Sequence, residues 1–172
     1  YNNIGSIYYS QKEFQKAMEY YHKALMILEK TLGKEHPTVA VTYCHIGDIY
    51  SSKEEYQKAL EYLNKALMIQ EKVLGDKHPD VAKSYTRIGA IYILQGKYQE
   101  AVKCHNKALM IIKRELGNKH LDVARSYDRI GITYYLQKDY LKALEYYQKA
   151  LITKEKLLGK EHPDVAISYN KI

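Results

Sequence analysis

The chain has 172 residues and a formal net charge of +7, with 27 Lys and Arg residues against 20 Asp and Glu residues. Apolar residues make up 46% of the sequence and charged residues 27%, which is typical of a folded chain and too apolar for a disordered one. No apolar run is long enough to span a membrane, no secretory signal opens the sequence, and the two cysteines are too few for a disulfide framework and suit a reducing, cytoplasmic compartment.

The sequence repeats itself every 42 residues. Two glycine columns, one histidine column and two alanine columns recur at this spacing: Gly5, Gly47, Gly89 and Gly131; Gly33, Gly75, Gly117 and Gly159; His36, His78, His120 and His162; Ala17, Ala59, Ala101 and Ala143; Ala24, Ala66, Ala108 and Ala150. The pattern predicts a single array over residues 1–172, with repeats at about 1–37, 38–79, 80–121 and 122–163 and the start of a fifth at 164–172. Because the chain begins inside a repeat and without Met, we expect it to be a piece of a longer protein.

Each repeat is expected to contain a shorter helix A and a longer helix B. In the third repeat, apolar residues recur at helical spacing from Val81 to Gln95 and again from Tyr98 to Leu116. The stretch around Gly96 separates the two helices, and Gly117 stands where a helix ends with positive φ. Proline follows the recurring histidine in three repeats and suits the first turn of the next helix A, so the histidines are interpreted as helix-start residues.

Small residues explain how two helices of one repeat close into a hairpin. If the helices pack antiparallel, Gly89 on helix A faces Ala101 and Ala108 on helix B, and the missing side-chain bulk lets the backbones approach. One hairpin cannot bury its apolar face alone, whereas stacked hairpins can. The predicted fold class is therefore all-α, an α-solenoid of stacked helical hairpins with a right-handed superhelical course.

The recurring residues resemble the tetratricopeptide repeat. That pattern is matched in the third and fourth repeats by Tyr85, Ile88, Gly89, Tyr92, Ala101, His105 and Ala108, and by Tyr127, Ile130, Gly131, Tyr134, Ala143, Tyr147 and Ala150. The longer, 42-residue unit is similar to the repeats of kinesin light chains and nephrocystin-3-type proteins. The resemblance implies a protein-interaction scaffold without enzymatic activity, in which helix A lines a concave groove that takes acidic peptides bearing an aromatic residue.

Catalytic and metal-binding roles are poorly supported by the sequence. The four recurring histidines lie on successive hairpins, roughly 10 Å apart, so they cannot converge on one metal ion. The adjacent pairs Cys44–His45 and Cys104–His105 point about 100° apart on a helix, and both cysteines are expected to be small buried hydrophobic residues. We predict no catalytic residue, no metal and no cofactor.

A peptide-binding surface is better supported, because one row of residues on each helix A lies opposite the row that closes the hairpin. Its first half is polar and its second half combines cations with apolar side chains. The residues predicted to bind a peptide are Asn3, Ser6, His45, Lys83, Arg87, Leu94, Arg125, Arg129, Ile132, Leu136 and Lys171. Arginine holds a carboxylate through two parallel hydrogen bonds, so an acidic partner with an apolar or aromatic anchor is the expected ligand.

Three alternatives stay open at this stage. The basic row could be an ordinary solvated face. The positive charge could serve RNA, which helical repeats read one base at a time, although the cations cover only half of the row. The chain could also associate with itself, end to end, through the apolar ends of an array without capping helices.

Overall fold

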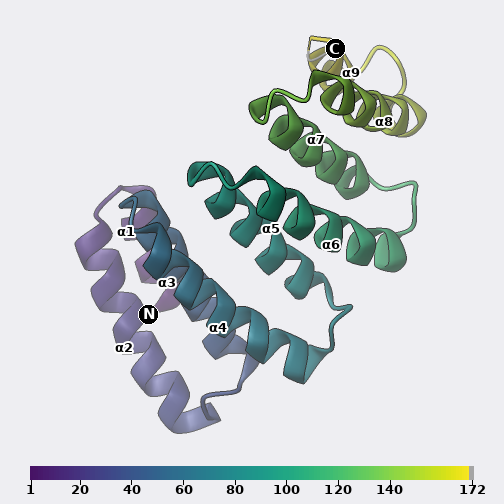
Figure 1. The fold of residues 1–172 in the computed structure, drawn as a ribbon. Coiled ribbons are helices and arrows are strands. Elements are labelled where there is room, and N and C mark those ends of the chain that lie inside the picture. The colour runs from purple at the N-terminus through teal and green to yellow at the C-terminus, as the bar shows by residue number, and fades with distance from the viewer. Residues whose placement is uncertain (171–172) are drawn as a thin grey trace. The chain divides into compact units, whose positions relative to one another are not determined.

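The computed structural model describes residues 1–170, and every regular element among them is an α-helix (Figure 1). The shorter A helices are α1 (Asn2–Ser10), α3 (Pro37–Ser52), α5 (Pro79–Leu94), α7 (Leu121–Leu136) and α9 (Pro163–Tyr169), and the longer B helices are α2 (Phe14–Leu32), α4 (Tyr56–Leu74), α6 (Tyr98–Leu116) and α8 (Tyr140–Leu158). The helical elements confirm the all-α prediction, and the alternation of shorter and longer helices confirms the predicted helices A and B. No helix within residues 1–170 has the length and apolar character needed to cross a membrane.

The helices form two compact units, Tyr1–Ile91 and Tyr92–Ile172, and the boundary between them falls inside α5. In the first unit α1 packs on α2, α2 on α3 and α3 on α4, and α1 also touches α3. In the second unit α6 packs on α7, α7 on α8 and α8 on α9. α3 and α7 therefore each contact both the B helix of their own repeat and the B helix of the preceding repeat, as stacked hairpins require.

The helix boundaries follow the recurring histidine, proline and glycine. The Nδ1 atom of His36 accepts a hydrogen bond from the backbone N–H of Thr38 at 3.2 Å, and the equivalent bonds reach His78, His120 and His162 at 3.2, 3.1 and 3.1 Å. These bonds satisfy N–H groups that the first turn of a helix leaves without a partner. The B helices end at glycines with positive φ, such as Gly117 at 78°. The predicted roles of the histidines at helix starts and of the glycines at helix ends are both confirmed.

The glycines on the A helices make room for a large side chain of helix B. A Cβ atom on Gly5 or Gly131 would lie 2.8 or 2.7 Å from the ring of Tyr21 or Tyr147. On Gly47 it would meet Leu63 at 2.9 Å and the carbonyl oxygen of Ala59 at 3.3 Å. Each of these glycines thus faces mainly the residue four positions after the first recurring alanine on helix B. The sequence predicted only the alanines as partners of the glycine.

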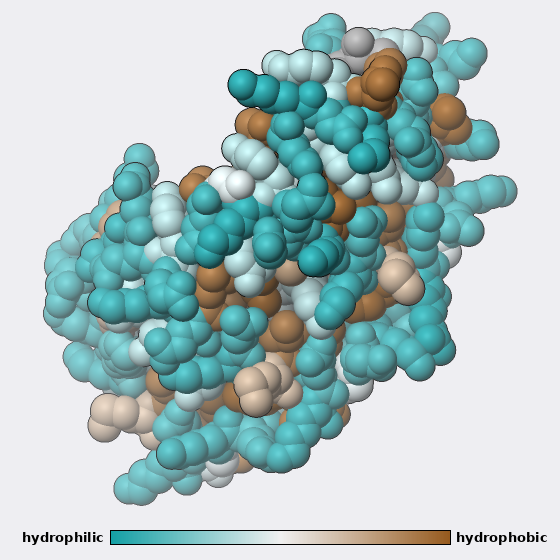
Figure 2. All heavy atoms as spheres, in the orientation of Figure 1, coloured by the Kyte–Doolittle hydropathy of each residue, from teal (hydrophilic) through white to brown (hydrophobic). Residues whose placement is uncertain are grey.

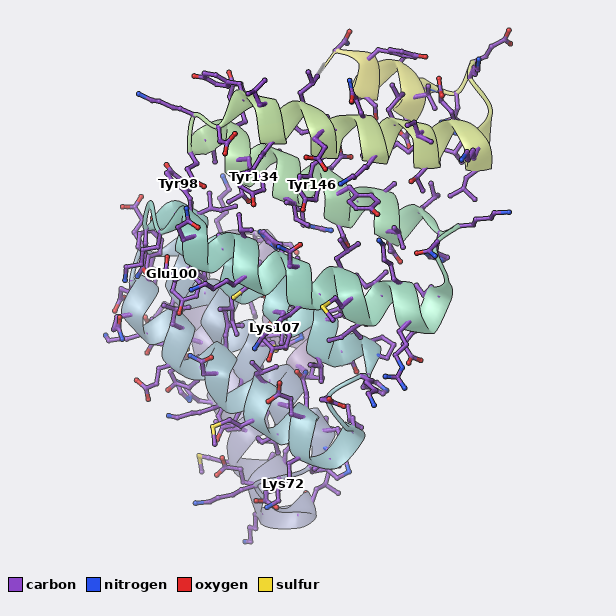
Figure 3. The ribbon with its side chains drawn as sticks, turned by 45° about the vertical axis from the view of Figure 1, so that its right-hand side comes forward. Lys72, Tyr98, Glu100, Lys107, Tyr134 and Tyr146 are labelled. Atoms are coloured by element: carbon purple, nitrogen blue, oxygen red, sulfur yellow. The ribbon has the colours of Figure 1, made fainter. Side chains whose placement is uncertain are left out.

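Tyrosines connect the helices outside this core. Tyr146 on α8 stacks on Tyr134 of α7 with ring centroids 5.6 Å apart (Figure 3), and Lys149 lies over the Tyr146 ring at 4.7 Å. A tyrosine of α3, α5 and α9 also joins its helix to the preceding B helix: Tyr43 donates to Glu29 at 2.8 Å. Tyr85 and Tyr169 donate in the same way to Glu71 and Glu155.

Candidate functional site

The predicted binding row is exposed in part: Ser6, His45 and Arg87 are half-buried, and the other described members are exposed. On α7, Ile130 and Gly131 are buried, whereas Arg125, Arg129 and Ile132 are exposed. On the part of α5 in the first unit, Ile88 is buried and the side chain of Lys83 is 67% exposed. Cationic and apolar side chains of this row are therefore accessible to a partner. On the face drawn in Figure 2, hydrophobic residues likewise appear between hydrophilic ones.

In the first unit the polar members of the row gather around Tyr21. The hydroxyl groups of Ser6 and Tyr21 are 3.0 Å apart, and the ring of His45 stacks on the Tyr21 ring at 5.1 Å with an angle of 9° between the planes. Burial lowers the pKa of His45, so its imidazole is neutral at pH 7. Asn3 is exposed on α1 and takes no part in this cluster.

Both cations of the first unit's row are paired with carboxylates of the chain itself. The Nζ atom of Lys83 lies 2.8 Å from Asp80 Oδ1, and the Nε atom of Arg87 lies 3.3 Å from Asp48 Oδ2. Burial raises the pKa of Asp48, and the positive charge of Arg87 opposes that rise. An acidic ligand must therefore compete with internal acids on this part of the surface.

The second unit presents a cation without such a competitor. Arg125 pairs with Asp122 at 2.8 Å, but no carboxylate among residues 1–170 lies within ion-pair distance of Arg129. Ile132 and Leu136 follow on the same face of α7 and are 39% and 41% exposed. Leu94, at the end of α5, is 55% exposed. Lys171 lies outside the described residues.

The histidines and cysteines considered above for catalysis or metal binding have surroundings that suit a structural role. In the part of the chain that the structure describes, no group of three or more His, Cys, Asp and Glu side chains could hold a metal ion. Burial raises the pKa of both cysteine thiols, which keeps them protonated and weakly nucleophilic at pH 7. Cys44 is buried as expected, but the prediction was wrong for Cys104, which is only half-buried because its side chain lies beside the core column and not in it.

Some residues that shape this surface were not selected from the sequence. Asp48, Asp80 and Asp122 neutralise three of the four described cations of the row, and Gln70 on α4 lines a cavity together with Asp80. The only sequence signal for Gln70 is a polar residue in a column otherwise held by Leu28, Ile112 and Lys154.

Stacked two-helix units with an accessible row on the shorter helices define an α-helical repeat protein. The chain belongs to the tetratricopeptide repeat family, whose model matches residues 1–72, 52–113, 80–151 and 122–172. Proteins of this family are generally scaffolds for protein–protein interactions and are typically not enzymes. No curated protein matches the sequence.

Several solved structures are similar in fold. BtubC (BKLC) from P. vanneervenii is 24% identical with a TM-score of 0.85, and the match covers 97% of this chain and 66% of that one. A putative kinesin light chain with nearly identical TPR-like repeats from Podosopora anserina is 25% identical with a TM-score of 0.86, covering 99% and 81%. The apo form of RapI is 23% identical with a TM-score of 0.76, covering 90% and 54%. The chain thus spans only part of each of these proteins.

Proposed function

We propose that this chain is a non-enzymatic interaction scaffold that binds acidic peptide segments along the accessible face of its A helices. The observation that carries the proposal is Arg129, an exposed guanidinium that pairs with no carboxylate within residues 1–170, beside the exposed apolar side chains of Ile132 and Leu136. These residues are spaced i, i+3 and i+7, so they share one face of α7. A carboxylate and an apolar anchor in one ligand complement that face.

The chemistry of arginine supports this choice of ligand. A guanidinium group binds a carboxylate through two parallel N–H···O bonds, which adds direction to charge attraction. An exposed apolar patch rimmed by cations is typical of a protein-binding surface. The cations of the first unit, already paired with Asp48 and Asp80, are expected to contribute less to affinity than Arg129.

The replacement Arg129→Ala is expected to weaken peptide binding by at least about tenfold, because a hydrogen bond to a charged group contributes roughly 1.5–3 kcal/mol. The probe is a fluorescein-labelled synthetic peptide with one tryptophan flanked by aspartate and glutamate, and fluorescence anisotropy gives the dissociation constant. Arg114→Ala is the matched control, since Arg114 is an exposed arginine in the last turn of α6. Equal affinity of the Arg129 variant and the original chain would contradict the proposal.

Self-association is a second proposal, favoured by exposed apolar side chains on α1 and at Tyr1, directly before it. Tyr1, Ile4 and Ile7 are 58%, 42% and 58% exposed. If this surface pairs with another copy, the mass measured by light scattering should rise with protein concentration. Replacing Ile4 and Ile7 with serine should then keep the protein monomeric, whereas a monomer mass for the unaltered chain at every concentration rejects the idea.

A further inference from the structure

The first unit contains a cavity of about 150 Å³ between α3 and α5, with α4 beneath it. Its lining includes His45 from α3, Gln70 from α4, and Asp80, Lys83 and Arg87 from α5. Ligand pockets for whole small molecules usually measure about 300–1,000 Å³, and one water molecule takes about 30 Å³. The cavity is therefore suited to a single polar side chain of a partner.

A nearly buried amide faces this space without a partner for its nitrogen. Gln70 is 4% exposed, and its Oε1 atom accepts a 2.6 Å hydrogen bond from the hydroxyl of Ser84. Within residues 1–170, Gln70 Nε2 makes no hydrogen bond to another protein group. Gln70 Nε2 is not one of the fully buried side-chain atoms without a partner, so it opens onto the cavity, where water or the acceptor group of a ligand can accept its hydrogen bonds.

The hydrogen bond from Ser84 determines which end of the amide is left free. The hydroxyls equivalent to Ser84 donate to the carbonyl four residues earlier in their own helix: Thr42, Ser126 and Ser168 do so at 3.1, 2.8 and 3.0 Å. The Ser84 hydroxyl instead donates to Gln70. Since Oε1 is the atom that accepts from Ser84, the NH2 end of Gln70 is the end that faces the cavity.

The junction of the fourth and fifth repeats shows the same three positions with every group paired. There Lys154, Asp128 and Ser168 occupy the places of Gln70, Cys44 and Ser84. The Nζ atom of Lys154 lies 2.7 Å from Asp128 and 2.8 Å from the Ser168 hydroxyl. In the second repeat Cys44, a weak acceptor, stands where Asp128 accepts; its sulfur lies 3.7 Å from the Ser84 hydroxyl and makes no hydrogen bond to Gln70 Nε2 within the described residues.

The charges around the cavity favour a neutral ligand over an anion. Lys83 is paired with Asp80, and Arg87 with Asp48, so each cation already faces a carboxylate. A carboxylate entering the cavity would approach Asp80, whereas a carboxamide offers an oxygen to Gln70 Nε2 and N–H donors to Asp80. We infer that this cavity is a carboxamide site, which receives the side chain of an asparagine or glutamine residue of the partner.

The inference rests on the proposed function only in that the partner supplies the amide, and small probes can test it alone. We titrate the uniformly 15N-labelled chain with propionamide and, separately, with propionate. The side-chain NH2 signals of Gln70 are assigned from their loss in Gln70→Leu, a residue that the first hairpin carries as Leu28. A five-atom ligand bound by such a site has a dissociation constant on the order of 1 mM.

Propionamide is expected to shift the Gln70 NH2 signals saturably and propionate is not, while the signals of the exposed Gln148 stay unchanged. Cys44→Asn is the second variant, because it keeps Gln70 and supplies an internal acceptor, and the propionamide shift should then disappear. A saturable shift with propionate alone, or no shift with either probe, overturns the inference. Either result leaves the Arg129 peptide experiment as a separate test, so failure of this site and failure of the proposed function are distinguishable.

Discussion

Replacing Lys154 with alanine is expected to lower the free energy of unfolding by about 3–5 kcal/mol, the range found when one partner of a buried ion pair is removed. Lys154 is 8% exposed and joins α7, α8 and α9 through its contacts with Asp128 and Ser168. Without the ammonium group, the Asp128 carboxylate stays in a site where its side chain is only 13% exposed. Urea unfolding followed by far-UV circular dichroism measures the loss.

The repeats provide a control that separates the charge from the packing. The third hairpin carries Thr86 and Ile112 at the positions of Asp128 and Lys154. The double variant Asp128→Thr with Lys154→Ile removes both charges and keeps the site filled, so it should be much more stable than Lys154→Ala. Lys156→Ala, at an exposed site on the same helix, should change stability by less than about 0.5 kcal/mol. A double variant as unstable as Lys154→Ala would contradict the ion-pair explanation.

The fold could be predicted from the sequence because its signals are local. The spacing of apolar residues predicts a B helix from Tyr98 to Leu116, and α6 has those bounds. The recurring histidine caps a helix even at His120, where Leu121 replaces proline. These features depend on residues within one or two turns of each other, so the chain sequence determines them without knowledge of the packing.

The electrostatics of the candidate site could not be predicted in the same way. Which acid meets Arg87 depends on the packing of α5 on α3, which brings Asp48 within reach from 39 residues away. The free end of Gln70 depends on two further long-range facts, the hydrogen bond from Ser84 and the thiol of Cys44 in place of a carboxylate. A helical wheel shows which residues share a face, but it does not show which of them are already neutralised.

The stability of the protein is expected to fall between pH 6.5 and about pH 4 because of His105. This side chain is 2% exposed, and neither ring nitrogen has a hydrogen-bond partner among residues 1–170. Burial lowers the pKa of His105 to about 4, and the positive charge of Arg129 acts in the same direction. As the pH falls, His105 of the unfolded chain therefore binds a proton near pH 6.5, whereas His105 of the folded chain binds it only near pH 4. The resulting loss in the free energy of unfolding is about 3 kcal/mol.

The variant His105→Leu isolates this effect, because Leu63 fills the same position in the second hairpin and is fully buried. At pH 7 it should be more stable than the original chain by about 1–3 kcal/mol, since an unpaired buried polar group is removed. The advantage should grow by about 3 kcal/mol on going to pH 4. The two proteins differ only at position 105, so the difference between their urea curves reports on His105 alone. The control variant His22→Gln, at an exposed position on α2, should show no such pH-dependent difference from the original chain. If the difference in stability between the original chain and His105→Leu stays constant with pH, the imidazole of His105 is not held neutral by burial.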